Sequence, residues 1–500
     1  MFIRGLCIEI LWHIGIILKI SGGKIMNNLR KILFITLLLV FSTNSLSFAT
    51  NWSDDIKKYK QFQSNIPKVS EEMLYPEFWI KNISHANKII ATPEEIEAYN
   101  RETINICEVV VDLENYQESF TKEELTQLIN NLSKVPDSPR YNSKGEKVEK
   151  EYYDMLIENL NLEGLKEINH VRYGVTVRRT EMRTFPTYDR LFSSPEDYNI
   201  DRFMETAVYA IEPMVILHES KDGEWYFAQI YNYLAWIPVK DVAVTDRETL
   251  FQYVNRKDFL VVTGSKVNTN YNPIKQEISE LQLDMGVRIP LANLEEIKED
   301  FYGQNPAGNF VVKIPTRNEN GNLEFDYALI QRTADVNLGY LPYTKANIIK
   351  QAFKFQGERY GWGGMFNGRD CSAFIMDIYR TMGVKLPRNS SEQGKLAAGI
   401  YQEFSETMTL DERQKIFNKL EPGTGLYMSG HAMLYLGKYK GEHYMIHDFS
   451  GFYTKVNDKI VYRNVWEVTV TPLSILTYSN GTYKTYMEAL FGAREFRLHK

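Results

Sequence analysis

The sequence predicts a multidomain α+β protein: a helical N-terminal segment at residues 50–170, two small β-barrels at 171–248 and 249–344, and a mixed domain at 345–500. Three features predict this class. Helix-capping signals mark the first segment, many short apolar runs fill the middle, and one apolar helix precedes strand-like runs at the end. With 500 residues, 44% of them hydrophobic, the chain can form several cores.

Residues 1–49 have the composition of a leader with a signal peptide. Arg30 and Lys31 precede an apolar core from Ile32 to Phe41, and Ser47-Phe48-Ala49 fits a cleavage site. The apolar core is shorter than a membrane span, and no cysteine follows the cleavage site to carry a lipid. We therefore expect export to the periplasm or the cell exterior, with no stable membrane anchor. Residues 1–25 are either an upstream mis-assigned start or part of a longer hydrophobic anchor.

The helical segment is expected to act as a scaffold or a cleft wall. TPEEIEAYN and TKEELTQLINNLSKV each begin with a threonine followed by acids, which is the pattern of a capping box. His85 and His170 fit surface or packing positions. The formal charge of −6, without a basic block, argues against nucleic acid as the main partner.

The two barrels are predicted from strand periodicity. GVTVRRTEMRTFPT, PMVILHES, GEWYFAQIYN and YLAWIPVKDV form the first set of short runs, broken by Gly, Pro, Asn and Asp. DFLVVTGSKV, MGVRIPLA, NFVVKIPTR and FDYALIQ form the second, with a hairpin signal at NENGN, residues 318–322.

The last domain contains the stretch with the clearest chemical pattern. An aromatic, glycine-rich loop leads into Asp370 and Cys371, and then into an apolar helix for which Asp370 is a suitable N-cap. The first turn of a helix has unpaired N–H groups and favours an anion, so we expect Cys371 to be a thiolate nucleophile. Cys107, in the apolar run INICEVVVDL, fits a buried small hydrophobe, and a Cys107–Cys371 disulfide is the alternative.

A cysteine nucleophile needs a base and a group that orients the base. His431 opens a strand and His447 ends the next one, so His431 is the predicted base and His447 the predicted orienter. His443 follows Gly441 in an expected turn and is left out of the site. A zinc ion bound by Cys371, His431 and His447 is a rival interpretation, although no second cysteine pair supports it. No metal or cofactor is otherwise expected.

The spaced motifs resemble those of the NlpC/P60 cysteine peptidases. The resemblance rests on Tyr-x-Trp-Gly-Gly, Asp-Cys-Ser at 370–372, LPRNSSEQ, Gly430-His431 and Met445-Ile446-His447. VRRTEMRTFPT, RFMETAVYAIEPMVILHES and YNYLAWIP resemble the first of two bacterial SH3-like barrels that precede such a domain. Ala373 departs from a frequent glycine, and the loop before Cys371 is slightly shorter than in some members.

The resemblance implies a papain-like core that cuts peptidoglycan stem peptides or muropeptides. The implied bond joins γ-D-glutamate to diaminopimelate or L-lysine, in substrates with a free N-terminal L-alanine. The implied substrate-binding residues are Asp370, Ser372, Tyr360, Trp362, Ser390, Tyr233 and Glu205.

Two other functions remain open from sequence alone. The barrels could make the chain a non-catalytic peptidoglycan-binding protein, or the same core could serve a thiol acyltransferase. The intact set of Cys371, His431 and His447 favours the hydrolase.

Overall fold

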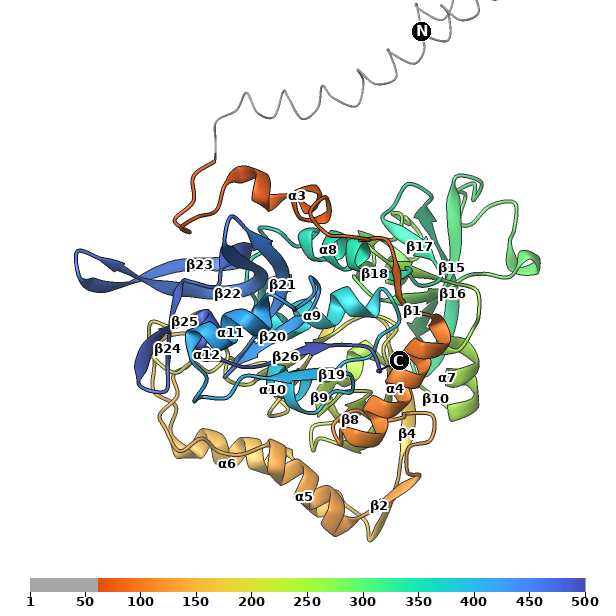
Figure 1. Ribbon diagram of the computed structural model, residues 1–500. Coiled ribbons are helices and arrows are strands. Elements are labelled where there is room, and N and C mark those ends of the chain that lie inside the picture. Colours follow the sequence, from red (N-terminus) through yellow and green to blue (C-terminus); the bar gives the residue numbers. More distant parts are fainter. Residues whose placement is uncertain (1–61, 500) are drawn as a thin grey trace, which may run out of the picture. The chain divides into compact units, whose positions relative to one another are not determined.

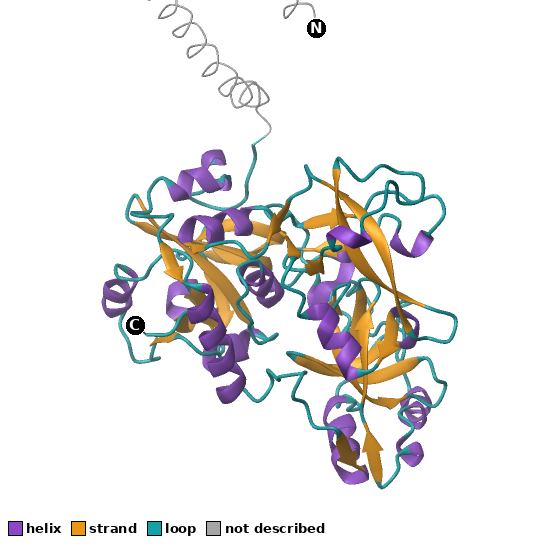
Figure 2. Ribbon diagram, turned by 90° about the vertical axis from the view of Figure 1, so that its right-hand side faces the viewer, coloured by secondary structure: helices purple, strands orange, loops and turns teal. Residues whose placement is uncertain are grey.

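The computed structural model describes residues 62–499, so the predicted leader and signal peptide lie outside the described residues. Within 62–499, no helix has both the length and the apolar composition that crossing a membrane requires. Figure 1 shows how the described elements follow one another, and Figure 2 shows strands gathered in sheets with helices along them.

The N-terminal segment is helical and is held by the caps that its sequence indicates. Thr92 and Glu95 form a capping box before α4, and Thr121 and Glu124 form another before α5, which confirms both predicted boxes. The elements of this segment are η1 (Glu71–Leu74), α3 (Pro76–Ile80), β1 (Ile89–Ala91), α4 (Pro93–Ile106), β2 (Ser119–Thr121), α5 (Lys122–Leu132), α6 (Lys150–Asn159), η2 (Leu162–Gly164) and β3 (Ile168–His170).

These helices share their apolar faces with the rest of the protein. Trp79 of α3 and Leu125 of α5 belong to the same buried cluster as Trp236 of the first barrel and Ile375 of the C-terminal domain. Strand β1 also pairs antiparallel with β18, just before the C-terminal domain. The segment therefore stabilises the other parts by packing against them.

The first barrel is a seven-stranded antiparallel sheet in the order β10-β4-β7-β8-β9-β5-β6. Its strands are β4 (Arg172–Thr176), β5 (Thr180–Arg183), β6 (Met204–Val208), β7 (Pro213–Glu219), β8 (Trp225–Ile230), β9 (Tyr233–Pro238) and β10 (Val242–Thr245), with η3 (Val239–Asp241) before β10 and α7 (Arg247–Val254) after it. Met182, Met214 and Ile237 lie in its fully buried interior.

The second barrel has a core of its own around Leu260, Leu283 and Ile314. Its elements are β11 (Phe259–Val262), β12 (Lys266–Asn268), η4 (Gln276–Ile278), β13 (Gln282–Asp284), β14 (Arg288–Pro290), η5 (Leu294–Glu296), β15 (Asn309–Arg317), β16 (Leu323–Gln331), β17 (Val336–Leu338) and β18 (Tyr343–Thr344). Strands β15 and β16 form the hairpin predicted at NENGN, and Gly321 there has φ of 84°.

The C-terminal domain packs one central helix, α9, on an antiparallel sheet in the order β19-β26-β20-β21-β22-β24-β25, with β23 paired to β22. Its helices are α8 (Lys345–Phe353), η6 (Trp362–Asn367), α9 (Cys371–Arg380), α10 (Ser390–Lys395), α11 (Leu410–Phe417) and α12 (Tyr486–Ala489). Its strands are β19 (Ile400–Glu403), β20 (Gly425–Met428), β21 (His431–Tyr439), β22 (Glu442–Val456), β23 (Lys459–Pro472), β24 (Leu476–Ser479), β25 (Thr482–Thr485) and β26 (Leu490–Glu495).

A buried network of charges joins the C-terminal domain to both barrels. The Arg369 side chain is fully buried and donates to Asp377 at 2.6 Å and to the second-barrel residue Asp284 at 3.3 Å. Tyr209 of the first barrel donates to the same Asp377 at 2.6 Å. Because an unpaired buried charge is strongly destabilising, these contacts fix the barrels against the domain.

Candidate active site

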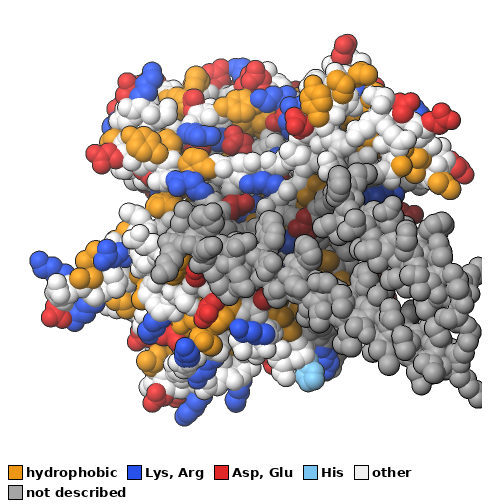
Figure 3. Space-filling view, turned by 90° about the horizontal axis from the view of Figure 1, so that it is seen from above, with side chains coloured by type: hydrophobic (Ala, Val, Ile, Leu, Met, Phe, Trp, Pro, Cys, Tyr) orange, Lys and Arg blue, Asp and Glu red, His pale blue; other side chains and the backbone are white. Residues whose placement is uncertain are grey.

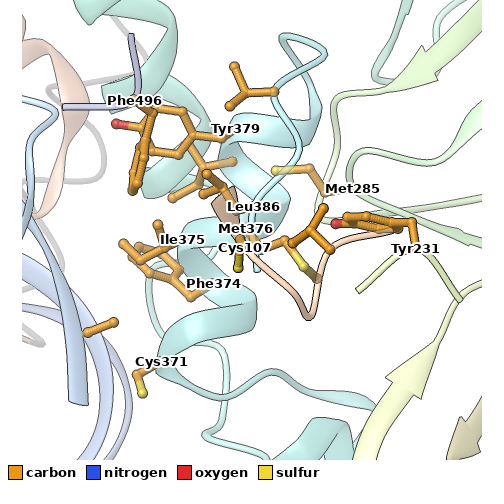
Figure 4. Close-up of a cluster of buried hydrophobic side chains, with 14 of the residues drawn as sticks. Cys107, Tyr231, Met285, Cys371, Phe374, Ile375, Met376, Tyr379, Leu386 and Phe496 are labelled. Carbon is orange, nitrogen blue, oxygen red and sulfur yellow. The ribbon is translucent and has the colours of Figure 1, made fainter. Parts of the chain in front are cut away.

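Cys371 is the first residue of α9, as the sequence predicts. The carboxylate of Asp370 accepts a hydrogen bond from the backbone N–H of Ala373 at 3.0 Å, so Asp370 is the N-cap. Every residue from Cys371 to Tyr379 is buried, so the helix is enclosed on all sides. Figure 4 shows Cys371 at the end of this helix, with Phe374 and Ile375 on the following turn.

Asp370 is also the centre of a buried polar cluster. Arg388 donates to both of its oxygens, at 3.1 and 2.7 Å, and to the hydroxyl of Ser372 at 2.9 Å. The Arg388 Nε donates to Thr206 of β6 at 2.6 Å, so the same guanidinium connects the first barrel to the residue before the nucleophile. The charge of Asp370 is therefore already compensated in the free protein.

The thiol of Cys371 is protonated in this environment. Burial raises its pKa to about 12, and the neighbouring carboxylate of Asp370 adds to the rise. The prediction of a thiolate from the helix start is therefore wrong for the free protein, because desolvation of the thiol outweighs the effect of the helix terminus. A separate base must take the proton.

Two histidines on adjacent strands provide a neutral imidazole pair. Nε2 of His431, at the start of β21, lies 2.7 Å from Nδ1 of His447 in β22. Burial lowers the pKa of His431 to about 4 and lowers the pKa of His447 well below its usual value. Both rings are therefore neutral near pH 7, and a neutral imidazole can accept a proton.

The beginning of β21 lies beside the nucleophile. The backbone N–H of Ala432 points toward the Cys371 thiol, and the Asp370 carboxylate acts electrostatically on the His431 ring. Within residues 62–499, no hydrogen bond joins Cys371 to His431 in this free state. Catalytic hydrogen bonds are often long in unliganded enzymes and tighten when substrate binds.

The first barrel forms a wall next to the loop that precedes Cys371. Strand β6 approaches η6 so closely that a Cβ on Gly363 would lie 2.8 Å from a Met204 carbon, and one on Gly364 would lie 2.4 Å from the Ala207 Cβ. Gly363 and Gly364 also have φ of 60° and 102°, which favours glycine. The two glycines of the Trp-Gly-Gly motif are therefore required by backbone shape and by the contact with the barrel.

Glu205 and Tyr233 lie together in this wall. Tyr233 and Thr184 both donate hydroxyl hydrogen bonds to the Glu205 carboxylate. No salt bridge to Glu205 is found in the described part of the chain. Glu205 is therefore a half-buried carboxylate whose hydrogen bonds within the described residues come only from neutral groups.

The remaining predicted substrate-binding residues differ in their surroundings. Tyr360 packs edge-on against Trp466 at 5.8 Å, and its pKa is raised by burial and then by Cys371. The Ser372 hydroxyl is held by Asp370 and Arg388. Trp362 lies in η6 and Ser390 begins α10, and both are partly exposed.

Two predictions about histidines are wrong. His447 does not end its strand, because β22 continues to Val456 in a long hairpin with β23. His443 is not in a turn: it is the second residue of β22, is 1% exposed, and lies 2.7 Å from the Tyr435 hydroxyl. The turn is shorter than expected, since Gly441 takes φ of 85° and lets pairing resume at once. His85 and His170 are exposed.

The alternatives for the cysteines are resolved by their covalent state and their surroundings. Cys107 and Cys371 are free and buried, and Figure 4 shows them at different heights along α9. Cys107 is fully buried, which confirms its prediction as a small hydrophobe. Among residues 62–499, no three His, Cys, Asp or Glu side chains are grouped to hold a metal ion, so the zinc interpretation lacks a ligand set.

Sequence reasoning missed several residues of this site. Arg388 lies inside the LPRNSSEQ motif, but only the structure reveals that it binds Asp370. Thr471 of β23 contacts His447, and its position among alternating strand residues gives no sequence signal. Asp448 follows His447 and is fully buried, and neither of its oxygens has a hydrogen-bond partner among residues 62–499.

Comparison with known proteins identifies two segments of the chain. Residues 357–473 match the model of the NlpC/P60 family, and residues 190–238 match the model of an SH3 domain (SH3b1 type). Over 102 residues the chain is 31% identical to gamma-D-glutamyl-L-lysine dipeptidyl-peptidase of Bacillus subtilis (strain 168). The matched segment covers 19% of this chain and 33% of that relative. The chain thus matches about a third of the length of this curated relative.

Solved structures match a larger part of the chain. An NlpC/P60 endopeptidase from Photobacterium damselae subsp. piscicida has a TM-score of 0.67 at 19% identity, covering 84% of this chain and 96% of that chain. An NlpC/P60 family protein from Bacillus cereus ATCC 10987 has a TM-score of 0.40 at 20% identity, covering 59% and 83%. The first likeness confirms the multidomain α+β fold.

Proposed function

The chain carries an NlpC/P60 family domain together with an SH3 domain of the SH3b1 type, and from that premise we propose that it is a cysteine peptidase acting on cell-wall peptides. The bond cut is the one between γ-D-glutamate and a diamino acid, diaminopimelate or L-lysine, in peptidoglycan stem peptides. The observation that most supports a cysteine peptidase is the buried thiol at a helix start with a neutral pair of imidazole rings beside it.

The chemistry starts from a neutral thiol and a neutral imidazole. As Sγ of Cys371 attacks the γ-glutamyl carbonyl, its S–H bond breaks and the proton passes to Nδ1 of His431. The Cys371 N–H, in the first turn of α9, donates to the developing oxyanion. His431 then returns the proton to the leaving amine, and water hydrolyses the acyl-enzyme.

Selection for a free N-terminal L-alanine is assigned to the first barrel. An ammonium group needs an uncompensated negative charge, and Asp370 is already bound by Arg388. Glu205 holds a carboxylate paired only with hydroxyl groups, so Glu205 becomes the leading candidate, with Tyr233 orienting it.

The same proposal includes export and a peptidoglycan partner. Export rests on the signal-like sequence at residues 26–49. Figure 3 shows one face of the protein, on which lysine, arginine and acidic side chains are interspersed.

The test uses the tripeptide L-Ala-γ-D-Glu-diaminopimelate, with L-lysine in place of diaminopimelate as a second substrate. We expect release of the dipeptide L-Ala-γ-D-Glu, and a large loss of kcat/KM when the alanine amine is acetylated. In Glu205→Gln, which keeps the hydrogen-bonding shape, we expect the free and acetylated substrates to be cut at similar rates. Absence of product at every pH, with retained binding to peptidoglycan, would favour the binding protein.

A further inference from the structure

A hydrogen-bonded chain of three buried side chains crosses three adjacent strands behind the predicted base. His431 Nε2 lies 2.7 Å from His447 Nδ1, and His447 Nε2 lies 2.8 Å from the hydroxyl of Thr471 in β23. His447 and Thr471 are both fully buried, and His431 is 8% exposed. The register explains the contact, because Thr469 lies opposite His447 and Thr471 follows two residues later on the same face.

Only one direction of this chain leaves His431 able to act as a base. Each neutral ring has one N–H donor and one acceptor nitrogen. If His447 donates from Nε2 to the Thr471 oxygen, its Nδ1 accepts from His431 Nε2–H, and His431 Nδ1 keeps a lone pair. If Thr471 donates instead, the order reverses and His431 carries its proton on Nδ1, where it cannot accept another.

We propose that Thr471 is a positioning residue that keeps both imidazoles in the productive tautomers, an inference that rests on the proposed peptidase function. Its oxygen is the acceptor for the His447 Nε2–H. Without that oxygen, the productive arrangement would bury an N–H with no partner, whereas the reverse arrangement would leave only an acceptor unpaired. Orphaned N–H groups are the rarer and more costly of the two, so the unproductive tautomer would gain population.

The same series of hydrogen bonds also stabilises the protonated His431 that forms during the reaction. When the Cys371 S–H bond breaks, His431 gains a proton on Nδ1 and becomes an imidazolium that donates from Nε2 to His447. His447 can accept because its own proton is on Nε2 and bonded to Thr471. A catalytic histidine held in the wrong tautomer loses most of its activity even when its geometry is intact.

The experiment compares Thr471→Val, which removes the hydroxyl while keeping the shape, with Thr471→Ser, which restores it. Imidazole 15N NMR shifts report which nitrogen of each histidine carries the proton, and they require no turnover. In the valine variant we expect a change of tautomer at both rings, and a fall in kcat of about tenfold to a hundredfold with KM unchanged. The serine variant is expected to recover both signals.

Thr469→Val is the matched control. Thr469 is a buried threonine on the same strand whose hydroxyl accepts from Gln356 at 3.1 Å and not from a ring. We expect it to leave tautomers and kcat unchanged. Wild-type tautomers in Thr471→Val would overturn the proposal, even with a lower kcat. Should the wild-type protein cleave no substrate, the peptidase function fails separately, and the 15N comparison still decides the role of Thr471.

Discussion

The buried carboxyl of Asp448 should make the protein lose stability as the pH rises. In the described part of the chain, both Asp448 oxygens lack a hydrogen-bond partner. Burial, followed by the nearby Asp370 and Glu358, raises the pKa of Asp448 well above the usual range. The folded protein therefore keeps a proton that the unfolded chain has released above about pH 4. The contribution of Asp448 to stability is fully present below its unfolded-state pKa, and it is lost as the pH rises toward the raised pKa of the folded state.

The size of the effect follows from proton linkage. While Asp448 stays protonated in the folded state, each pH unit costs up to about 1.4 kcal/mol, or up to about 2.7 kcal/mol from pH 5 to 7. Asp448→Asn has no proton to keep, so its stability advantage over the wild-type protein should grow as the pH rises over the same interval, by up to this amount.

The assay is urea denaturation at pH 5, 6 and 7, followed by tryptophan fluorescence. Asp458→Asn is the control, since Asp458 lies at the tip of the same hairpin with its side chain 93% exposed. We expect Asp458→Asn to show no pH-dependent gain in the free energy of unfolding over the wild-type protein. A free-energy difference between Asp448→Asn and the wild-type protein that is constant across the three pH values would refute the reasoning.

Two further predictions concern the polar groups of the site. Burial lowers the pKa of His431 to about 4, so kcat/KM should begin to fall on the acid side only near pH 4. A fall in kcat/KM near the usual histidine pKa of about 6.5 would contradict the neutral imidazole pair. Arg388→Met should lower the free energy of unfolding by roughly 3–5 kcal/mol, because it leaves the Asp370 carboxylate buried without its cation. Calorimetry of this variant measures the loss, and an unchanged melting temperature would contradict the role of Arg388.

Local patterns were sufficient to predict the elements that carry the site. The Asp370 cap, the helix that begins at Cys371, the strand that begins at His431 and the NENGN hairpin all follow from signals within a few residues. These features depend on backbone chemistry near the residue itself, so the sequence alone can indicate them.

Properties that depend on distant parts of the chain were not predicted. The protonated state of Cys371 results from enclosure by other elements, which no local pattern reports. The pairing of Arg388 with Asp370 and the contact of Thr471 with His447 join segments that meet only in the folded protein. The long β22–β23 hairpin, which Figure 1 shows extending from the sheet, moved His447 from a strand end to a strand interior.

The most direct measurement is the rate of L-Ala-γ-D-Glu release from the tripeptide by wild-type protein and by Cys371→Ala, with circular dichroism to verify that both are folded. If the sulfur is the nucleophile, the alanine variant is folded and releases no dipeptide above the uncatalysed rate. Dipeptide release at the wild-type rate by folded Cys371→Ala would contradict the account.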